Sequence, residues 1–296
     1  MSDENVVEID FDDDTEALDT SSVDLPPMDQ PQDATLRIGL VGSGTLAESV
    51  RLSLAYPAPP AKVEFYQFDD IDDAVANDQV HLYFVTTEVE IMKDDIVDDA
   101  VLVDQVNKLS KTKASVCVKS TINLETLNRL LQVIPADRLV YSPELVTDMD
   151  MKDIIRSDTN IIGGTPNSTG SYNRLMQGQQ IFDRKNVVLS FKEAVVLKLA
   201  VSAKKAVVQT FHNQLHAYAQ DADINYNIIS KTLANVVEHA EDSIPTHLRA
   251  IAEGASVKRA KSFSGEYANR DIRVFASETD KLPLLDECIN YKNLKD

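Results

Sequence analysis

Three small residues early in the chain have the spacing of a phosphate-binding turn. Gly42, Gly44 and Ala47 form GxGxxA directly after the apolar run "LRIGLV" and at the start of a helical pattern. In such a turn the first glycine permits a tight bend, the second lets a pyrophosphate approach the backbone, and the third small residue keeps helix and strand close. We therefore expect a dinucleotide-binding turn. The alternative is a turn that only connects two elements in a fold that no longer binds nucleotide.

An acidic residue at the end of the following strand suits the same ligand. Asp69 follows "VEFYQF", 25 residues after Gly44, where a carboxylate can accept hydrogen bonds from the ribose hydroxyls of NAD. A carboxylate there would repel the extra phosphate of NADP. Thr86, in "HLYFVTT", is assigned to the same site. The expected cofactor is NAD.

The elements that would position these residues alternate between strand and helix from residue 36 to residue 190. Apolar runs separated by helical patterns predict a parallel sheet that is covered on both faces and joined by right-handed crossovers. The predicted strands are "LRIGLVG", "KVEFYQFDD", "HLYFVTT", "ASVCVKS", "RLVYSPE", "NIIGG" and "KNVVLSF". We predict an α/β fold in which residues 36–190 form a Rossmann-like, doubly wound, mostly parallel sheet.

From residue 191 the pattern becomes helical. "KEAVVLKLAVSAKKAVVQTFHNQLHAYAQDA" contains no Gly or Pro, and a helix of about thirty residues would be about 45 Å long. Its apolar stripe consists of Val195, Leu199, Ala203, Ala206, Val207, Phe211, Leu215 and Tyr218. Because helices of this length bridge two halves of a protein or pack against another copy, we expect residues 191–296 to form a long helix and a helical dimerisation domain.

The first 35 residues carry much of the charge. The formal net charge of the chain is -19, and residues 1–35 contain twelve Asp and Glu residues but no Lys or Arg. Such a segment buries too little apolar surface to offset its chain entropy, so we expect a tail that is disordered or docked on a partner. The expected partner is a basic protein surface, whereas nucleic acid and anionic membranes are disfavoured.

Other classes of site have little support in the sequence. Cys117 and Cys288 lie in no CxxC or His-flanked pattern, and the helical histidines lack a ligand set, so we expect neither a disulfide framework nor a metal. No stretch reaches about 18 consecutive apolar residues, and the N-terminus is acidic. These features favour a soluble protein of the cytoplasm or of a larger assembly.

Four later segments carry a family resemblance. They are "VKSTI" (118–122), "YSPELVTD" (141–148), "NIIGG" (160–164) and "EAVVLKLAVSA" (193–203). Their order and spacing resemble the UDP-glucose/GDP-mannose dehydrogenase family over residues 36 to about 276. The family oxidises a sugar alcohol to a carboxylate in two NAD-dependent hydride transfers.

The resemblance implies four catalytic positions that this chain retains. Thr121 matches the threonine that orders the catalytic water beside the nicotinamide, and Glu144 matches the acid/base glutamate. Lys198 matches the lysine that stabilises oxyanion charge, and Asp271 matches the aspartate that ends the family's glycine-rich loop. Removing an alcohol proton and stabilising an alkoxide require such a base and fixed cation.

The departures from the family bear on the same reaction. Tyr267, in "SFSGEYANRD", stands where the family has its nucleophilic cysteine, and a phenol with a pKa near ~10 is a poor nucleophile at neutral pH. Ser202 replaces an asparagine one turn after Lys198, and Arg270 replaces the lysine before Asp271. The family has a second nucleotide-fold domain that holds the UDP part of the substrate, and we expect no such domain after the long helix of this sequence.

We therefore expect a degenerate nucleotide-sugar dehydrogenase-like protein that is not an active enzyme and serves as a homo-oligomeric assembly module. A larger particle, such as a virus, is one setting for it. Two alternatives stay open. One is an NAD-dependent oxidoreductase, either a UDP-glucose 6-dehydrogenase or a single-step alcohol oxidoreductase, and the other is an NAD-sensing module without chemistry.

Overall fold

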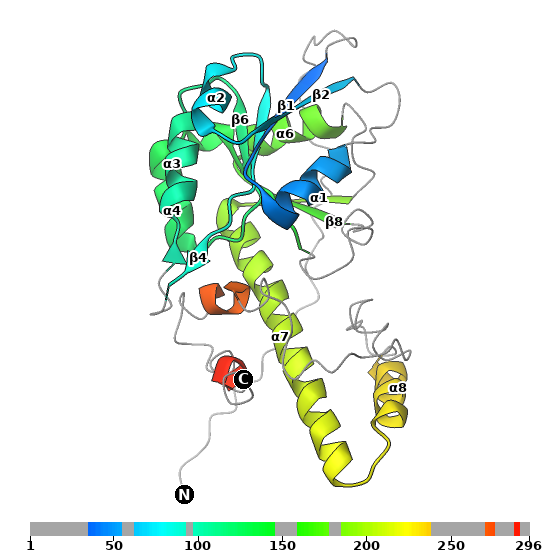
Figure 1. The fold of residues 1–296 in the computed structure, drawn as a ribbon. Helices are drawn as coiled ribbons and strands as arrows, with labels where there is room; N and C mark the ends of the chain where they lie inside the picture. The colour runs from blue at the N-terminus through cyan, green and yellow to red at the C-terminus, as the bar shows by residue number, and fades with distance from the viewer. Residues whose placement is uncertain are drawn as a thin grey trace, which may run out of the picture. The chain divides into compact units, whose positions relative to one another are not determined.

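Seven of the apolar runs form one sheet in the computed structural model (Figure 1). The strand order is β2-β1-β3-β6-β7-β8-β9, and each neighbouring pair is parallel except β7 and β8. The strands are β1 (Leu36–Val41), β2 (Val63–Phe68), β3 (Leu82–Val85), β6 (Ser115–Val118), β7 (Leu139–Tyr141), β8 (Thr159–Gly163) and β9 (Lys185–Leu189). The prediction of a Rossmann-like, mostly parallel sheet is confirmed.

The structure describes residues 35–54, 62–92, 97–145, 159–177, 185–237, 270–275 and 287–290. All of them belong to one compact unit, Asp33–Asp296. The acidic tail apart from Thr35, and Tyr267, lie outside the described residues.

Helices follow most of the strands, and several were not predicted. They are α1 (Gly44–Leu54), α2 (Ile71–Ala76), α3 (Ala100–Leu109), α4 (Leu124–Val133), η2 (Ala136–Arg138), α6 (Pro166–Gln177), α7 (Phe191–Asp221) and α8 (Tyr226–Val237). Residues 270–275 and 287–290 form two further helical turns. The apolar pattern of the sequence did not predict α2, α4, α6 or the small antiparallel ladder of β4 (Glu90–Ile91) and β5 (Val97–Asp98).

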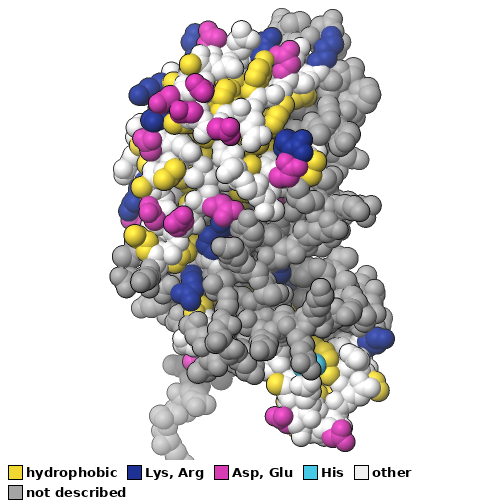
Figure 2. Space-filling view, in the orientation of Figure 1, with side chains coloured by type: hydrophobic (Ala, Val, Ile, Leu, Met, Phe, Trp, Pro, Cys, Tyr) yellow, Lys and Arg dark blue, Asp and Glu magenta, His cyan; other side chains and the backbone are white. Residues whose placement is uncertain are grey.

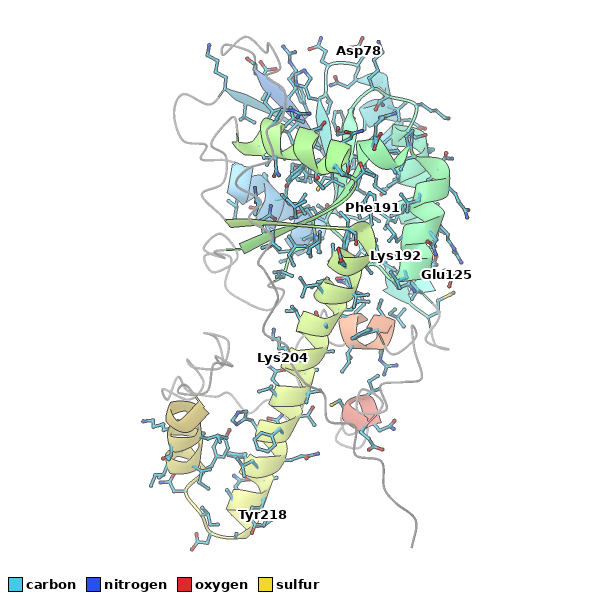
Figure 3. All side chains as sticks on the ribbon, turned by 180° about the vertical axis from the view of Figure 1, so that it is seen from behind. Asp78, Glu125, Phe191, Lys192, Lys204 and Tyr218 are labelled. Atoms are coloured by element: carbon cyan, nitrogen blue, oxygen red, sulfur yellow. The ribbon has the colours of Figure 1, made fainter. Side chains whose placement is uncertain are left out.

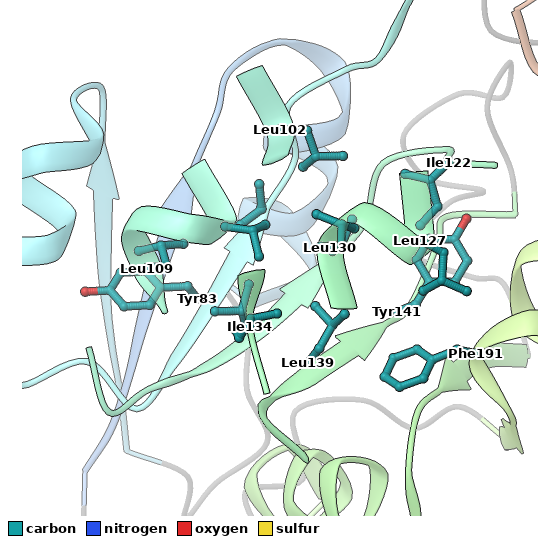
Figure 4. Close-up of a cluster of buried hydrophobic side chains, with 14 of the residues drawn as sticks. Tyr83, Leu102, Leu109, Ile122, Leu127, Leu130, Ile134, Leu139, Tyr141 and Phe191 are labelled. Atoms are coloured by element: carbon teal, nitrogen blue, oxygen red, sulfur yellow. The ribbon is translucent and has the colours of Figure 1, made fainter. Parts of the chain in front are cut away.

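Alternate residues of the central strands enter two separate cores because the sheet is covered on both faces. On β3, Tyr83 and Val85 join a core with α3, α4 and the start of α7, whereas Leu82 and Phe84 join one with α1 and α6. Figure 4 shows the first core, in which the side chains from α3 and α4 pack toward Leu139 and Tyr141 of β7 and Phe191 of α7. Burial on both faces explains why these strands read as continuous apolar runs.

The long helix α7 starts at a strong cap and runs for 31 residues, which confirms the predicted long helix. The Ser190 hydroxyl accepts a hydrogen bond from the Glu193 amide, and the Glu193 carboxylate accepts one from the Ser190 amide, which completes a capping box. The helix carries Phe191 and Lys192 at its start, Lys204 near its middle and Tyr218 near its end (Figure 3).

Acidic and basic side chains are interspersed on the face of the sheet domain seen in Figure 2. Several form exposed ion pairs, such as Arg37 with Glu64 and Lys108 with Asp72. Such exposed pairs contribute little to stability, so the packing of the two cores holds the fold. None of the described helices combines the length and apolar character that a membrane span requires.

Candidate functional site

The glycine turn lies at the carboxyl end of β1, where ligands of open parallel sheets bind. Gly42 and Gly44 have φ angles of +119° and +85°, a region that favours glycine. A Cβ at Gly42 would lie 2.5 Å from Thr86 Oγ1, whereas a Cβ at Gly44 would meet no atom within 4 Å. Gly42 is therefore required by the fold itself, and Gly44 leaves its side of the turn open to a ligand.

The other predicted cofactor residues surround this turn. Ala47 is buried in α1 against the core, which keeps helix and strand close as expected of the third small residue. Asp69 is exposed and follows Phe68, the residue that pairs with Val41 immediately before the turn. It therefore lies where a ribose hydroxyl could be bound.

Thr86 has a structural contact beneath the turn. Its amide and its hydroxyl both donate to the Val41 carbonyl, at 2.9 and 3.2 Å, and the side chain is fully buried. This threonine ties the carboxyl end of β3 to that of β1. Its contact with a cofactor stays a prediction.

A buried ion pair joins α7 to the helical turn at 270–275. Lys198 Nζ lies 2.9 Å from Asp271 Oδ2, and the Ser202 hydroxyl donates to the same oxygen at 2.8 Å. The side chains of Lys198 and Asp271 are 1% and 0% exposed. The lysine ammonium therefore faces a carboxylate of its own chain, and the Ser202 hydroxyl is a second polar contact of that carboxylate.

Arg270 connects the same turn to two loops of the sheet. Its guanidinium lies 3.2 Å from Glu88 Oε2, 3.4 Å from Thr121 Oγ1 and 3.5 Å from Asp271 Oδ1. Glu88 follows β3 and Thr121 follows β6. Three segments that are distant in sequence thus meet at one guanidinium.

The electrostatics of this centre keep Asp271 ionised. Burial alone would raise the pKa of the Asp271 carboxyl, but the charges of Lys198 and Arg270, with the hydrogen bond from Ser202, outweigh it and lower the pKa. Burial and the charge of Asp271 raise the pKa of Tyr141, at the end of β7. The Asp271 carboxylate therefore stays charged within its buried ion pair with Lys198.

Glu144 has a charged partner that no motif in the sequence indicates. Lys119 Nζ lies 3.7 Å from Glu144 Oε2, and both side chains are nearly buried. Lys119 follows β6, and Glu144 lies just beyond β7, so both are at the carboxyl edge of the sheet. The charge of the predicted acid/base residue is therefore balanced within the chain.

Both thiols of the chain are described, and both are buried. Cys117 points into a core from β6, where burial raises its pKa to about 12. Cys288 packs against Ala203 and Ala206 of α7, and burial raises its pKa as well. Neither position presents a thiolate.

The structure thus brings Thr121, Lys198, Ser202 and Asp271 together, with Arg270 as the connecting residue that sequence reasoning left without a role. In the sequence, Arg270 stands out through its position beside Asp271 at the end of "SFSGEYANRD". Among the described residues, no group of three His, Cys, Asp or Glu side chains is arranged to hold a metal ion.

Comparisons with known proteins support the fold. No protein-family model matches the sequence. A search of curated proteins finds no match either. A UDP-glucose dehydrogenase from Pyrobaculum islandicum is 13% identical, with a TM-score of 0.66, over 90% of this chain and 70% of that chain. A UDP-D-ManNAc dehydrogenase from Pyrococcus horikoshii is 13% identical, with a TM-score of 0.57, over 86% and 68% of the two chains.

A third solved structure matches over nearly its whole length. The 3-hydroxyisobutyrate dehydrogenase of Mycobacterium tuberculosis, in a structure with L-serine, is 12% identical with a TM-score of 0.63. The match covers 88% of this chain and 94% of that chain. At these identities the likeness is one of fold: this chain has the fold of nucleotide-sugar and hydroxy-acid dehydrogenases.

Proposed function

We propose that this chain is a degenerate nucleotide-sugar dehydrogenase-like protein that does not oxidise a sugar alcohol to a carboxylate and acts as a self-associating assembly module. The observation that carries the loss of chemistry is the burial of both thiols, Cys117 at 0% and Cys288 at 3% exposure. The second hydride transfer of the family reaction proceeds from an adduct between a thiolate and the aldehyde. A chain without an accessible thiol has no group that forms this adduct.

The paired charges support the same proposal. In the family reaction, Lys198 would stabilise a developing alkoxide and Glu144 would move a proton. In this chain, Lys198 is paired with Asp271 and Glu144 with Lys119, and all four side chains are almost fully buried. A cation that is already neutralised by a buried carboxylate stabilises a new anion less well.

An assay of sugar oxidation tests the loss of chemistry. The purified chain is incubated with UDP-glucose and NAD while the nicotinamide absorbance is followed. We expect no turnover above that of a mock purification. Sustained reduction of NAD by the wild-type chain would overturn the proposal. The variant Tyr267→Cys/Ser202→Asn, which restores two family residues, is the matched comparison.

Self-association is supported by the apolar side chains that α7 and α8 expose. Phe211 and Tyr218 of α7 are 51% and 65% exposed, and Ile228 of α8 is 64% exposed. Contact with a second copy would bury them, at about 25 cal/mol for each Å² of apolar surface. The acidic tail would dock on a basic protein surface, and the assembly would act in the cytoplasm or within a larger particle.

Light scattering on the full chain and on a chain lacking residues 1–35 tests this half of the proposal. We expect a mass of at least two copies for the full chain. The same number of copies in the two forms would assign self-association to α7 and α8, and fewer copies in the shortened form would assign it to the tail. Monomeric mass in both forms, without capture of a partner, would contradict the proposal.

A second candidate function is a single-step, NAD-dependent alcohol oxidation, which needs no thiol. The open side of Gly44 favours it, because a bound dinucleotide requires that space. NAD would be held by the turn at Gly42 and Gly44 and by Asp69, and it would accept the hydride. The match with 3-hydroxyisobutyrate dehydrogenase over nearly all of that chain supports this reaction class.

Calorimetric titration with NAD tests the second candidate before any substrate is known. Wild type should bind NAD, and Gly44→Ala should bind it at least about tenfold more weakly, because the new methyl group enters the ligand's space. Reduction of NAD with 3-hydroxyisobutyrate or L-serine would then establish turnover. Absence of binding by wild type removes this candidate and leaves the assembly proposal in place.

A further inference from the structure

The outer face of α7 carries a regular row of side chains, which we call the seam. Its positions follow one another at alternating steps of four and three residues, and they are Leu197, Val201, Lys204, Val208, Phe211, Leu215 and Tyr218. All of them except the lysine are apolar, and none is buried. Alternating steps of four and three form a heptad repeat, by which one helix packs against another.

The seam is distinct from the face that joins α7 to its own chain. Val195, Leu199 and Ala206 are buried in the cores described above. At about 100° per residue, these positions lie on the opposite side of the helix from Leu197 and Val208. The stripe expected from the sequence therefore combined two faces, of which one is used within the chain and the other is exposed.

The helix α8 contacts α7 beside the seam. The Tyr226 hydroxyl of α8 lies 3.0 Å from His212 Nδ1, and its ring meets His216 edge-on. Both histidines directly follow seam positions, so they lie about 100° farther round the helix. Phe211 and Tyr218 stay 51% and 65% exposed, on a stretch of α7 that runs clear of the sheet (Figure 3). Among the described elements, none covers the seam there.

We propose that the seam packs against the same seam of a second copy, with the two α7 helices antiparallel. This inference rests on the proposed self-association and adds its contact surface and orientation. A heptad row fits a partner helix with the same repeat, and α7 of a second copy supplies one of equal length. From Leu197 to Tyr218 the seam is about 33 Å long. Its apolar side chains from both copies leave water together.

Lys204 decides between the two orientations. In a parallel pair in register, the two Lys204 ammonium groups would face each other across one layer and repel. In an antiparallel pair with its two-fold axis at Val208, the middle position of the seam, position 212 of the partner lies opposite Lys204. The two lysines are then about 12 Å apart along the helices. Each ammonium reaches water past the edge of the seam while its stem stays packed.

Oxidative cross-linking of single-cysteine variants of the full chain tests the pairing. Val208→Cys should form a disulfide-linked dimer with itself, because this position lies at the two-fold axis. Val201→Cys and Leu215→Cys, mixed while dilute and then concentrated, should cross-link with each other. Neither should cross-link with itself, because position 201 of one copy lies opposite position 215 of its partner. Circular dichroism checks the fold of each variant.

Val101→Cys, at a 62% exposed position of α3, measures cross-linking by collision. Val208→Cys should exceed it about fivefold or more, since groups within one complex have effective concentrations in the mM range. Wild type is the blank, because Cys117 and Cys288 are buried.

Light scattering before oxidation separates this inference from the proposed function. Association with equal cross-linking in Val208→Cys and Val101→Cys would overturn the seam and leave self-association in place. Self-cross-linking of Val201→Cys at the level of Val208→Cys would overturn the antiparallel orientation. Single copies in wild type and in every variant would contradict both the proposed self-association and the seam.

Discussion

The two halves of α7 carry one apolar stripe but have different environments. In the first half, residues 191–206, eight side chains are buried, and they include Lys198, Leu199 and Ser202. In the second half, residues 207–221, Thr210 and Ala219 are the buried ones, and Phe211 and Tyr218 are largely exposed. One continuous apolar stripe is thus divided between a core and a surface.

The contacts along the helix explain the difference. The first half packs against β7, β8, β9 and α4, and the pair of Lys198 and Asp271 joins it to the turn at 270–275. Among the described elements, α8 is the main contact of the second half. The first half therefore holds this chain together, and the second half has apolar surface left for another chain. The predictions below test this division.

The largest effect is expected from removal of the buried cation. Lys198→Met leaves the Asp271 carboxylate buried beside Ser202 and Arg270 without its main partner, which should cost about 3–5 kcal/mol of unfolding free energy. Urea denaturation measures this loss. Lys204→Met, on an exposed position of the same helix, should change it by less than about 0.5 kcal/mol. Equal losses of unfolding free energy in the two variants would mean that the ion pair of Lys198 and Asp271 contributes no more to stability than an exposed lysine.

The same pair should make stability depend on pH. The folded-state pKa of Asp271 lies below its unfolded value, so its contribution is complete above the unfolded pKa, near ~4, and is lost as pH falls through the lower folded pKa. The difference in unfolding free energy between wild type and Asp271→Asn should be largest near neutral pH and should shrink below about pH 4. A difference that is constant from neutral to acidic pH would contradict this assignment.

A smaller effect is expected at the start of the first half. Ser190→Ala removes the side-chain acceptor of the Glu193 amide and should cost about 1 kcal/mol. Thr232→Ala, at an exposed position within α8, is the control and should cost less than about 0.5 kcal/mol. A loss at Ser190 no larger than that of the control would mean that the capping box does not stabilise α7.

The strands and the long helix were predictable because their signals are local. Runs such as "HLYFVTT" are apolar on both faces, and α7 begins with a Ser190–Glu193 box and contains no Gly or Pro. The helix α4 has a weaker local signal, with Asn123 as its cap and Leu127 and Leu130, both buried, at helical spacing. The helix α6 is polar and contains a glycine, so its sequence has little of the apolar periodicity from which a helix is predicted.

The site was predictable only in part. The glycine turn and Lys198 came from motifs, and the structure brings Lys198, Ser202 and Asp271 together. The contact of Arg270 with Glu88 had no signal, because it joins segments that are far apart in sequence and depends on how the chain folds back. Nor could the apolar stripe of α7 indicate where burial stops, since periodicity shows a face and not its cover.

The most direct test of the division of α7 compares mass and stability in one variant. In Phe211→Ser/Tyr218→Ser, light scattering should show dissociation into single copies, while unfolding free energy at low protein concentration changes by less than about 0.5 kcal/mol. Val101→Ser, at a 62% exposed apolar position of α3, should keep the mass of wild type. An unchanged mass in the double variant, or a large loss of stability in it, would contradict the account.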